Sequence, residues 1–246
     1  RGVIEVGHNG ADAGYRSDVV RFPEHDLAIA MFCNLSTMQP WMLTRKVAEI
    51  VLGPGVFEPL PPAVAMSEQE LKALEGAYWN ELTDEVRRFS IKDGKLMAGG
   101  SSDALVPIGG GRFRAGETSA QIAFPAVASG GVQELHVLSP TLPVAKFKRV
   151  VAPTQTREEL AAFVGAFFSS ELEATFRVVV TDDGKLELRS ARGEPVTLRP
   201  LMRDTFTLFN FATFTFTRGT GGTVTGLTTS DGRVRRLALT KTGPGQ

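Results

Sequence analysis

The sequence predicts a mostly β protein in which three antiparallel strands and a helix precede two tandem eight-stranded antiparallel β-barrels. Three observations support this fold class. The opening residues 1–55 contain three strand-like runs and then a helical pattern, whereas the remaining chain contains one set of features twice. Each copy holds about eight short strand candidates separated by turns. An up-and-down meander of that size closes most simply into a small barrel, because closure removes the exposed strand edges.

The first block is expected to supply three strands and one helix. Residues 3–6 are largely β-branched and should form a strand that ends in a turn at residues 7–10. Residues 15–22 alternate as a half-buried strand does, and the uniformly apolar residues 27–33 indicate a central strand covered on both faces. Residues 40–52 predict a helix that starts at a proline. Its packing stripe should comprise Trp41, Thr44, Val47, Ala48 and Val51. These elements bury too little to stand alone, so we expect the block to be the end of a larger domain.

The rest of the chain indicates a duplication. A proline-rich segment, residues 56–65, should act as a semi-rigid linker before barrels at residues 66–152 and 153–246. Each barrel begins with a capping box, in which Ser or Thr is followed three residues later by Glu. A Gly-Ala-aromatic triplet and an Asp-Gly turn then recur in both copies, about 90 residues apart. With the short helix that follows each capping box, these make four unlike features in one order, which predict two copies of one unit.

Composition excludes several functional classes. Lys and Arg together number 27, as do Asp and Glu, so the net charge is zero and neither nucleic acid nor an anionic membrane is expected as a partner. The single cysteine allows no internal disulfide, and the three scattered histidines do not have the spacing of metal ligands. We therefore expect no metal and no cofactor, and a cytoplasmic location. The chain opens with Arg1 instead of Met, so the natural N-terminus is expected to lie further upstream.

The candidate site is the segment Gly7-His8-Asn9-Gly10-Ala11. A histidine between glycines at the mouth of a strand leaves the strand edge uncrowded. An extended substrate could pair with that backbone while the imidazole reaches its reacting or anionic end. The alternative interpretation of the same residues is a polar strand end followed by a turn.

These residues and those that follow them resemble the closing third of a penicillin-recognising serine hydrolase domain. This family contains class C β-lactamases, D-aminopeptidases and many bacterial esterases. His8-Asn9-Gly10 matches its third motif, Lys/His-x-Gly, and residues 14–17, residues 21–24, the apolar strand, Asn34 and the terminal helix follow in the family's order. The resemblance covers roughly the first 52 residues. Some members, D-aminopeptidase among them, carry C-terminal barrels that resemble lipocalins, and residues 63–246 are similar in layout.

The resemblance implies roles for individual residues. His8 would assist the nucleophile or orient the substrate, the backbone N–H of Ala11 would be the second oxyanion-hole donor, and Asn9 and Gly10 would lie in the substrate-binding strand. The implied substrate is a small molecule or peptide with an amide or ester bond, with D-aminopeptidase-like action as the first expectation. No serine in the chain has lysine three residues later, so the Ser-x-x-Lys nucleophile motif is absent. The chain alone is therefore predicted to be inactive and to need an N-terminal catalytic portion, in the same or a separate chain.

Two alternatives remain open at this point: lipocalin-like barrels that bind a small apolar ligand, and barrels that only mediate docking. Residues 78–80 spell the family's second motif, Tyr-x-Asn, but they follow the third motif and are predicted to be a barrel strand. Residues 241–243 spell Lys-Thr-Gly and are predicted to be a strand end. Cys33 is expected to be an inert core residue. A phenylalanine-rich stretch is expected to fill the second barrel, and it comprises Phe206, Phe209, Phe211, Phe214 and Phe216.

Overall fold

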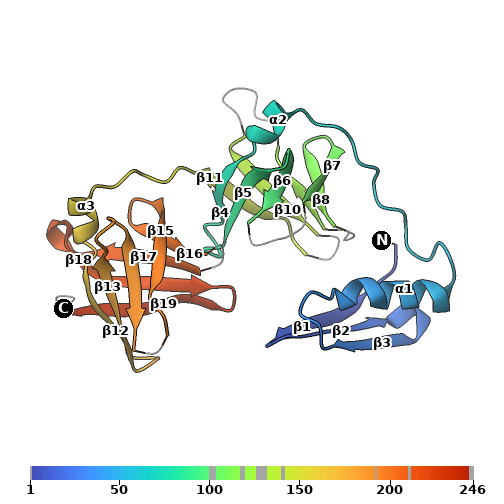
Figure 1. Ribbon diagram of the computed structural model, residues 1–246, viewed down its shortest axis with the longest axis horizontal. Coiled ribbons are helices and arrows are strands. Elements are labelled where there is room, and N and C mark those ends of the chain that lie inside the picture. Colours follow the sequence, from blue (N-terminus) through green and yellow to red (C-terminus); the bar gives the residue numbers. More distant parts are fainter. Residues whose placement is uncertain are drawn as a thin grey trace. The chain divides into compact units, whose positions relative to one another are not determined.

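The computed structural model describes residues 2–99, 104–116, 120–125, 132–139, 142–191, 193–209 and 212–243. The chain divides into two compact units (Figure 1): the first reaches Ala63, and the second holds the two barrels. The fold is mostly β, with one three-stranded sheet, one eight-stranded sheet curled into a barrel and one closed eight-stranded barrel. The predicted fold class is thus confirmed.

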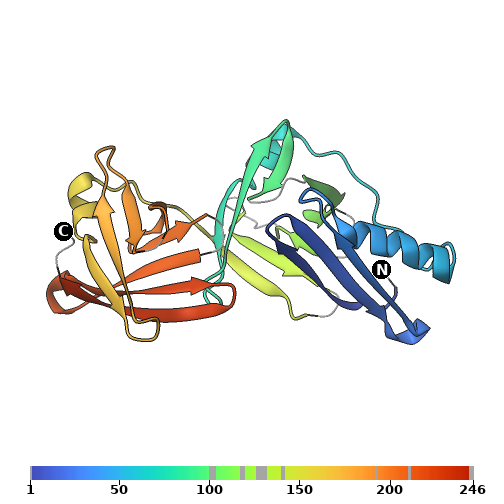
Figure 2. The same ribbon diagram turned by 60° about the horizontal axis from the view of Figure 1, so that its bottom comes forward.

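The first unit is an antiparallel meander covered by one helix (Figure 2). Its elements are β1 (Val6–Asp12), β2 (Tyr15–Phe22), the 3-10 turn η1 (Pro23–His25), β3 (Leu27–Cys33) and α1 (Pro40–Leu52). The strands lie in the order β1-β2-β3, and α1 packs on one face of β2 and β3. The small core beneath α1 comprises Val20, Phe22, Ile29, Ala48 and Phe57. β2, β3 and α1 have the predicted bounds.

The first strand was predicted in the wrong place. β1 begins at Val6, where the predicted strand ends, and continues to Asp12 through the residues assigned to a turn. Every residue from Val6 to Asp12 pairs with β2. A Cβ on Gly7 would come within 2.3 Å of the Val19 carbonyl oxygen, so this glycine permits close strand pairing and does not mark a turn. The chain reverses instead at Ala13, which has a positive φ angle of 47°.

The described part of this unit covers β3 on one face only, so the prediction of a central strand covered on both faces depends on a layer that this unit does not supply. β3 is an edge strand, and its side chains alternate: Ile29 is buried beneath α1, whereas Phe32 is 78% exposed on the other face. Within the described part of this unit, no element covers that second face. Cys33 is consequently half-buried at the strand end instead of packed in a core. On α1, Ala48 is buried as predicted, but Val51 is 58% exposed.

The predicted linker is partly incorporated into the first unit. Phe57 is 4% exposed and its ring centroid lies 6.0 Å from that of Phe22. Val56 packs against the same core. The segment after α1 therefore begins as packed structure, and the boundary at Ala63 falls inside the predicted linker.

The first barrel starts with the short helix α2 (Glu68–Lys72). Its strands are β4 (Gly76–Trp79), β5 (Val86–Lys92), β6 (Lys95–Ala98), β7 (Leu105–Gly109), β8 (Arg112–Ala115), β9 (Gln121–Ala123), β10 (Glu134–Leu138) and β11 (Ala145–Val150). Their order is β6-β5-β4-β11-β10-β9-β8-β7, and an isolated bridge between Met97 and Ala104 nearly closes the sheet. Tyr78, Phe89, Phe113 and Phe124 pack edge to face inside it.

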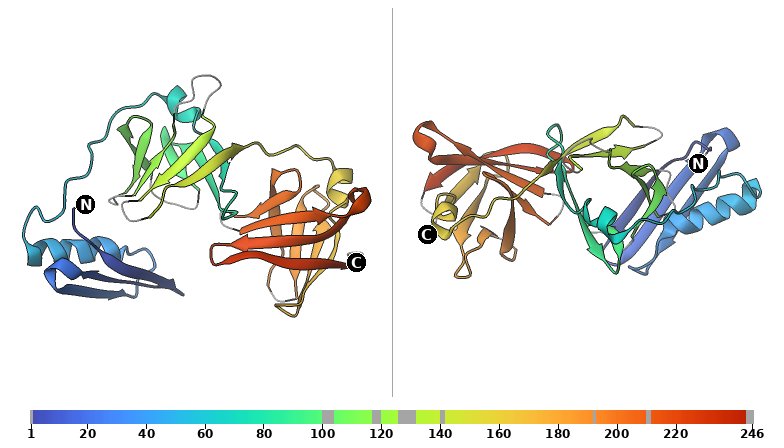
Figure 3. Two further views of the ribbon diagram at one scale, coloured as in Figure 1. Left: turned by 180° about the vertical axis from the view of Figure 1, so that it is seen from behind. Right: turned by 90° about the horizontal axis from the view of Figure 1, so that it is seen from above.

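The second barrel starts with α3 (Arg157–Ala161) and is fully closed. Its elements are β12 (Gly165–Ser169), β13 (Ala174–Val180), β14 (Leu186–Ser190), β15 (Val196–Met202), β16 (Thr205–Leu208), β17 (Ala212–Arg218), η2 (Thr220–Gly222), β18 (Val224–Asp231) and β19 (Val234–Gly243). The last strand, β19, pairs with β12 and completes the ring (Figure 3). β18 and β19 form a hairpin at Asp231-Gly232, as the sequence predicts.

Aromatic side chains fill the second barrel. Phe163 contacts both Phe206 and Phe216, with ring centroids 5.1 and 4.7 Å apart. Phe214 is buried as well, which confirms the prediction for three of the five phenylalanines. Phe209, by contrast, is 59% exposed, and Phe211 lies outside the described residues. An interior filled in this way disfavours the hypothesis that the barrel carries an apolar ligand inside.

The two barrels repeat each other in detail. Both predicted capping boxes form, at Ser67 with Glu70 and at Thr156 with Glu159. The backbone N–H of Phe124 donates to the Gly111 carbonyl, and Phe216 donates to Asp204 in the same way. One residue after a proline, each copy has a β-bulge, at Ile108 between β7 and β8 and at Leu201 between β15 and β16. This shared irregularity supports the duplication that the sequence indicates.

Contacts join the barrels within the second unit. The bulge residue Leu201 is fully buried in a cluster with Ala77 and Val86 of the first barrel. Asp84, from the turn between β4 and β5, accepts hydrogen bonds from Ser230 Oγ and Arg236 Nε, each at 3.0 Å. An apolar bulge and an ion pair thus connect the second barrel to the first.

Both look-alike motifs occupy the structural positions predicted for them. Tyr78 and Trp79 belong to β4, and Asn80 follows the strand, where its Oδ1 accepts backbone N–H bonds from Leu82 and Thr83. Lys241 lies near the end of β19, which pairs with β12. Among the described helices, none has the length and apolar character needed to cross a membrane.

Candidate functional site

The candidate residues lie on β1, the edge strand of the first unit. A turn of two residues separates Asp12 from Tyr15, so this pair must be one that exchanges both backbone hydrogen bonds. Bonded and non-bonded pairs alternate along an antiparallel ladder. Gly7, Asn9 and Ala11 therefore direct their N–H and C=O groups away from β2. In the described part of the chain no strand pairs with that outer edge.

Side chains on β1 alternate between the two faces of the sheet. His8, Gly10 and Asp12 pair with Val19, Ser17 and Tyr15, on the face opposite α1. His8 is exposed, so its imidazole is accessible to a substrate. Gly10 presents no side chain, and a Cβ there would come within 2.6 Å of Ser17 Oγ. The edge therefore combines an accessible imidazole, a glycine without a side chain and the outward N–H of Ala11.

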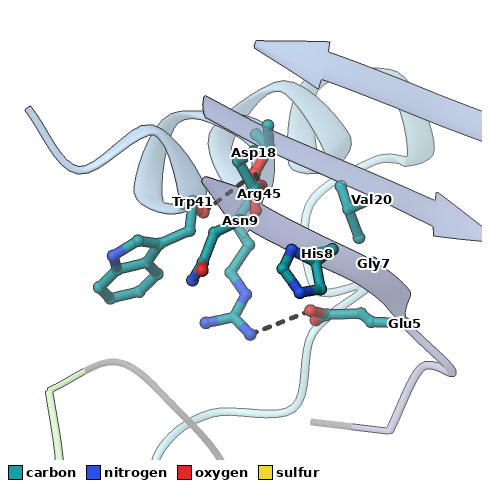
Figure 4. Close-up of a pocket in the computed structure, with 9 residues that line it drawn as sticks. Glu5, Gly7, His8, Asn9, Asp18, Val20, Trp41 and Arg45 are labelled. Atoms are coloured by element: carbon teal, nitrogen blue, oxygen red, sulfur yellow. Dashed lines mark hydrogen bonds and ion pairs between the residues drawn. The ribbon is translucent and has the colours of Figure 1, made fainter. Parts of the chain in front are cut away.

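A cavity of about 240 Å³ adjoins this strand edge (Figure 4). It is bounded by residues from β1, β2, the start of α1 and the segment before β1. The lining residues are Glu5, Gly7, His8, Asn9, Asp18, Val20, Trp41, Thr44 and Arg45. His8 and Asn9 are thus among the lining residues, whereas Gly10 and Ala11 lie farther along β1 and do not line the cavity.

An ion pair crosses the cavity. Arg45 Nη2 lies 3.0 Å from Glu5 Oε2, and each side chain is about one-fifth exposed (Figure 4). The Arg45 guanidinium also lies 5.5 Å from the centre of the Trp41 ring. Partial burial strengthens such contacts relative to a fully solvated pair. The geometry joins α1 to the segment preceding β1 and places both charge signs at the cavity wall.

A buried carboxylate lies on the neighbouring strand. Thr44 Oγ1 donates a hydrogen bond of 2.5 Å to Asp18 Oδ2, and the two residues are 1% and 8% exposed. Asp18 belongs to β2 and Thr44 to the first turns of α1, so this bond fixes the helix to the sheet. A buried carboxylate needs such a donor, because removal from water without one is costly.

The cavity can bind and orient a polar group, but it lacks an activated nucleophile. Its lining contains no serine, cysteine or lysine, and the Thr44 hydroxyl is already donated. Among the described residues, no cluster of three His, Cys, Asp or Glu side chains could hold a metal ion. Acyl transfer at this edge would therefore need a nucleophile and its base from elsewhere.

Sequence reasoning missed six of the nine residues that line this cavity. Glu5, Asp18 and Arg45 were not assigned to any site, and Trp41 was assigned to helix packing. One signal was present: Trp41, Thr44 and Arg45 have the spacing of one helix face, and that face carries a charge and a hydroxyl. Which strand residues face it depends on the hairpin register, and no register can be derived when β1 is placed at residues 3–6.

Comparisons with known proteins do not place the chain in a family. No protein-family profile and no curated protein matches it. A solved structure, "Crystal structure of SurE with D-Leu", is 14% identical over 97% of this chain, with a TM-score of 0.22. The chain spans about a third of that structure, 35% of its length. A TM-score this low does not indicate a shared fold.

Proposed function

We propose that the first unit is the closing part of a penicillin-recognising serine hydrolase domain. In this proposal the chain supplies the His-x-Gly strand and two accessory barrels to an enzyme that cleaves an amide, peptide or ester bond through an acyl-enzyme. The carrying observation is the edge of β1. There His8, Gly10 and the outward N–H of Ala11 lie on a strand whose outer edge pairs with no described strand, and His8 lines the adjacent cavity.

The uncovered face of the sheet supports this proposal. Four large apolar side chains lie on the face away from α1, and each is 45% exposed or more: Val6, Tyr15, Val19 and Phe32. A sheet normally buries both apolar faces, and an exposed apolar surface of this kind marks an interface. A further layer of a larger domain would cover it, and that layer would also bring the missing nucleophile.

The proposed mechanism uses two groups of this chain. A serine from the preceding catalytic portion attacks the substrate carbonyl, and negative charge develops on the carbonyl oxygen. The outward N–H of Ala11 donates to that oxygen, a contribution of about 3 kcal/mol to the transition state where such donors have been removed. His8 accepts or returns a proton, or orients the substrate's leaving side. The free backbone of β1 pairs with the extended substrate.

The first experiment extends the polypeptide through the preceding coding sequence, which should encode Ser-x-x-Lys and Tyr-x-Asn. The extended enzyme should release a burst of product from an activated ester or amino-acid anilide. His8→Ala should lower kcat by about 100-fold or more with little change in unfolding temperature. His25→Ala is the matched control, because His25 is an exposed histidine of the same unit. If both motifs are absent upstream, or if the two variants behave alike, the proposed catalysis is refuted.

A second experiment tests the oxyanion donor. Ala11→Pro removes one backbone N–H at an outer strand edge, where proline is tolerated. The proposal predicts a fall in kcat of about 100-fold with the unfolding temperature nearly unchanged. Ala11→Ser keeps the N–H and should retain activity. Equal activity in the two variants would show that this N–H does not contact the developing charge.

A further inference from the structure

A second cavity lies at the α3 end of the second barrel. Its volume is about 490 Å³, within the range of small-molecule sites in proteins. The lining residues are Pro153, Thr154, Gln155, Glu159, Ala162, Phe163, Arg203 and Arg218. None of them takes part in the proposed hydrolase chemistry, and the cavity belongs entirely to the second unit.

Gln155 has an unsatisfied acceptor in this cavity wall. Its Nε2 donates to the Arg203 carbonyl oxygen at 3.1 Å, which fixes the orientation of the side-chain amide. The Oε1 atom is buried and receives no hydrogen bond from any described residue. A buried acceptor without a donor is unfavourable, and native proteins rarely leave one unexplained. A bound N–H donor would satisfy it.

The first barrel provides an internal comparison. Gln155 immediately precedes the Thr156 capping box, and Met66 occupies the same place before the Ser67 capping box. Met66 packs against the apolar core of its barrel and has no polar atom to satisfy. The bulge alignment likewise places Arg203 opposite Gly110, since each lies two residues after its bulge residue. The polar character of this cavity is therefore specific to the second copy.

The two arginines at the cavity differ in how many partners their guanidinium groups have. Arg218 donates to Asp204 Oδ1 from Nε and Nη2 at 3.0 and 2.7 Å and to the Gly222 carbonyl at 2.7 Å. Its guanidinium also lies over the Phe163 ring, so this group is engaged in contacts within the protein. The Arg203 guanidinium, by contrast, has no hydrogen-bond or ionic partner among the described residues. Glu159 contributes a carboxylate, one oxygen of which caps α3.

We propose that this cavity binds a free amino acid as its zwitterion. The ligand carboxylate pairs with the Arg203 guanidinium, which suits planar carboxylates. The ligand ammonium donates to Gln155 Oε1 and lies near Glu159. The ligand side chain rests against Pro153 and Ala162. A ligand with only one of the two charged groups leaves either Arg203 or Gln155 without a partner.

The test measures binding to the full chain with alanine as the probe, and with propionate and isopropylamine as its carboxylate-only and amine-only analogues. The readout is the ¹H–¹⁵N shift of the Gln155 side-chain amide during titration. Alanine should saturate the shift, and each analogue should bind at least tenfold more weakly. If alanine causes no saturable shift, or if either analogue matches it, the zwitterion site is refuted.

Two variants with one matched control locate the site. Gln155→Met copies the residue of the first barrel and should weaken alanine binding at least tenfold while raising the unfolding temperature of the free protein, because it removes the unsatisfied acceptor. Arg203→Gln should weaken alanine binding similarly. Met66→Gln changes the equivalent position of the other barrel and should leave binding intact. These variants are followed through the Phe163 amide, which all of them retain. Unchanged affinity in Gln155→Met or Arg203→Gln would overturn the proposal, and it would do so without reference to any hydrolase activity.

Discussion

Leu201→Ala should uncouple the two barrels. The Leu201 side chain is fully buried, and it packs against Ala77 and Val86 of the other barrel, with Trp79 partly buried beside them. Truncating a fully buried leucine costs about 3 kcal/mol, within the usual range of roughly 2–5. For a pair of barrels of this size, that loss corresponds to a fall in unfolding temperature of roughly 6–12 °C.

The assay is urea unfolding followed by the fluorescence of Trp79, in a Trp41→Phe background that removes the other tryptophan of the chain. The matched control is Ile108→Ala at the equivalent bulge of the first barrel, where the side chain is only half-buried. It should cost about 1–1.5 kcal/mol, because less apolar surface returns to water. The wild type should unfold both barrels in one transition, and Leu201→Ala should separate them.

The reasoning would be refuted if the two alanine variants lost the same stability, or if Leu201→Ala left a single unchanged transition. Either result would mean that the cluster around Leu201 contributes nothing beyond the cores of the separate barrels.

Three further outcomes can be checked. Asp84→Asn should lower the unfolding temperature of the barrel pair by removing the charge that Arg236 contacts, and the loss should shrink as salt rises, because Arg236 is 62% exposed. Hydrogen bonds from Ser67 hold the pKa of Glu70 below its usual value. The stability that this carboxylate contributes is therefore present above about pH 4.3 and is lost as the pH falls through the lowered pKa. Thermal unfolding measured between about pH 5 and pH 3 would show this loss. Gly7→Ala should destabilise the first unit by about 1–3 kcal/mol in chemical denaturation, because its Cβ meets backbone, whereas Gly10→Ala should cost less, because its Cβ meets a serine side chain that can rotate.

Local signals predicted the elements whose pattern is complete in the chain itself. β2 and α1 have the predicted bounds because alternation, an initial proline and a terminal glycine are visible without knowing any partner. β1 was misplaced because glycine, asparagine and histidine are weak strand formers on their own. They form a strand because β2 pairs with them and because Gly7 permits the close approach. That cause is not local.

The candidate site shows the same limit. His8 and Asn9 could be singled out, because a histidine between glycines is unusual within one short segment. The groups around them, Glu5, Asp18 and Arg45, come from the segment before β1, from β2 and from α1, and only the tertiary fold brings them together. The predicted burial of β3 likewise depends on groups outside the described unit. Its composition predicts two covering layers, and the described part of the unit supplies one.

The bulge in the second barrel packs Leu201 against the first barrel. The contact between the two copies is therefore heterologous, which means that unlike surfaces meet. Such a contact uses a different surface on each copy, so each copy keeps one surface that the contact does not use. The surface that Leu201 contacts on the first barrel includes Trp79. The corresponding residue of the second barrel, Phe168, is 39% exposed. The residue of the first barrel that corresponds to Leu201 is Ile108, which is only half-buried. The first barrel thus keeps a residue equivalent to Leu201, and the second barrel keeps a surface equivalent to the one that Leu201 contacts. A third repeat could be added through the same kind of contact.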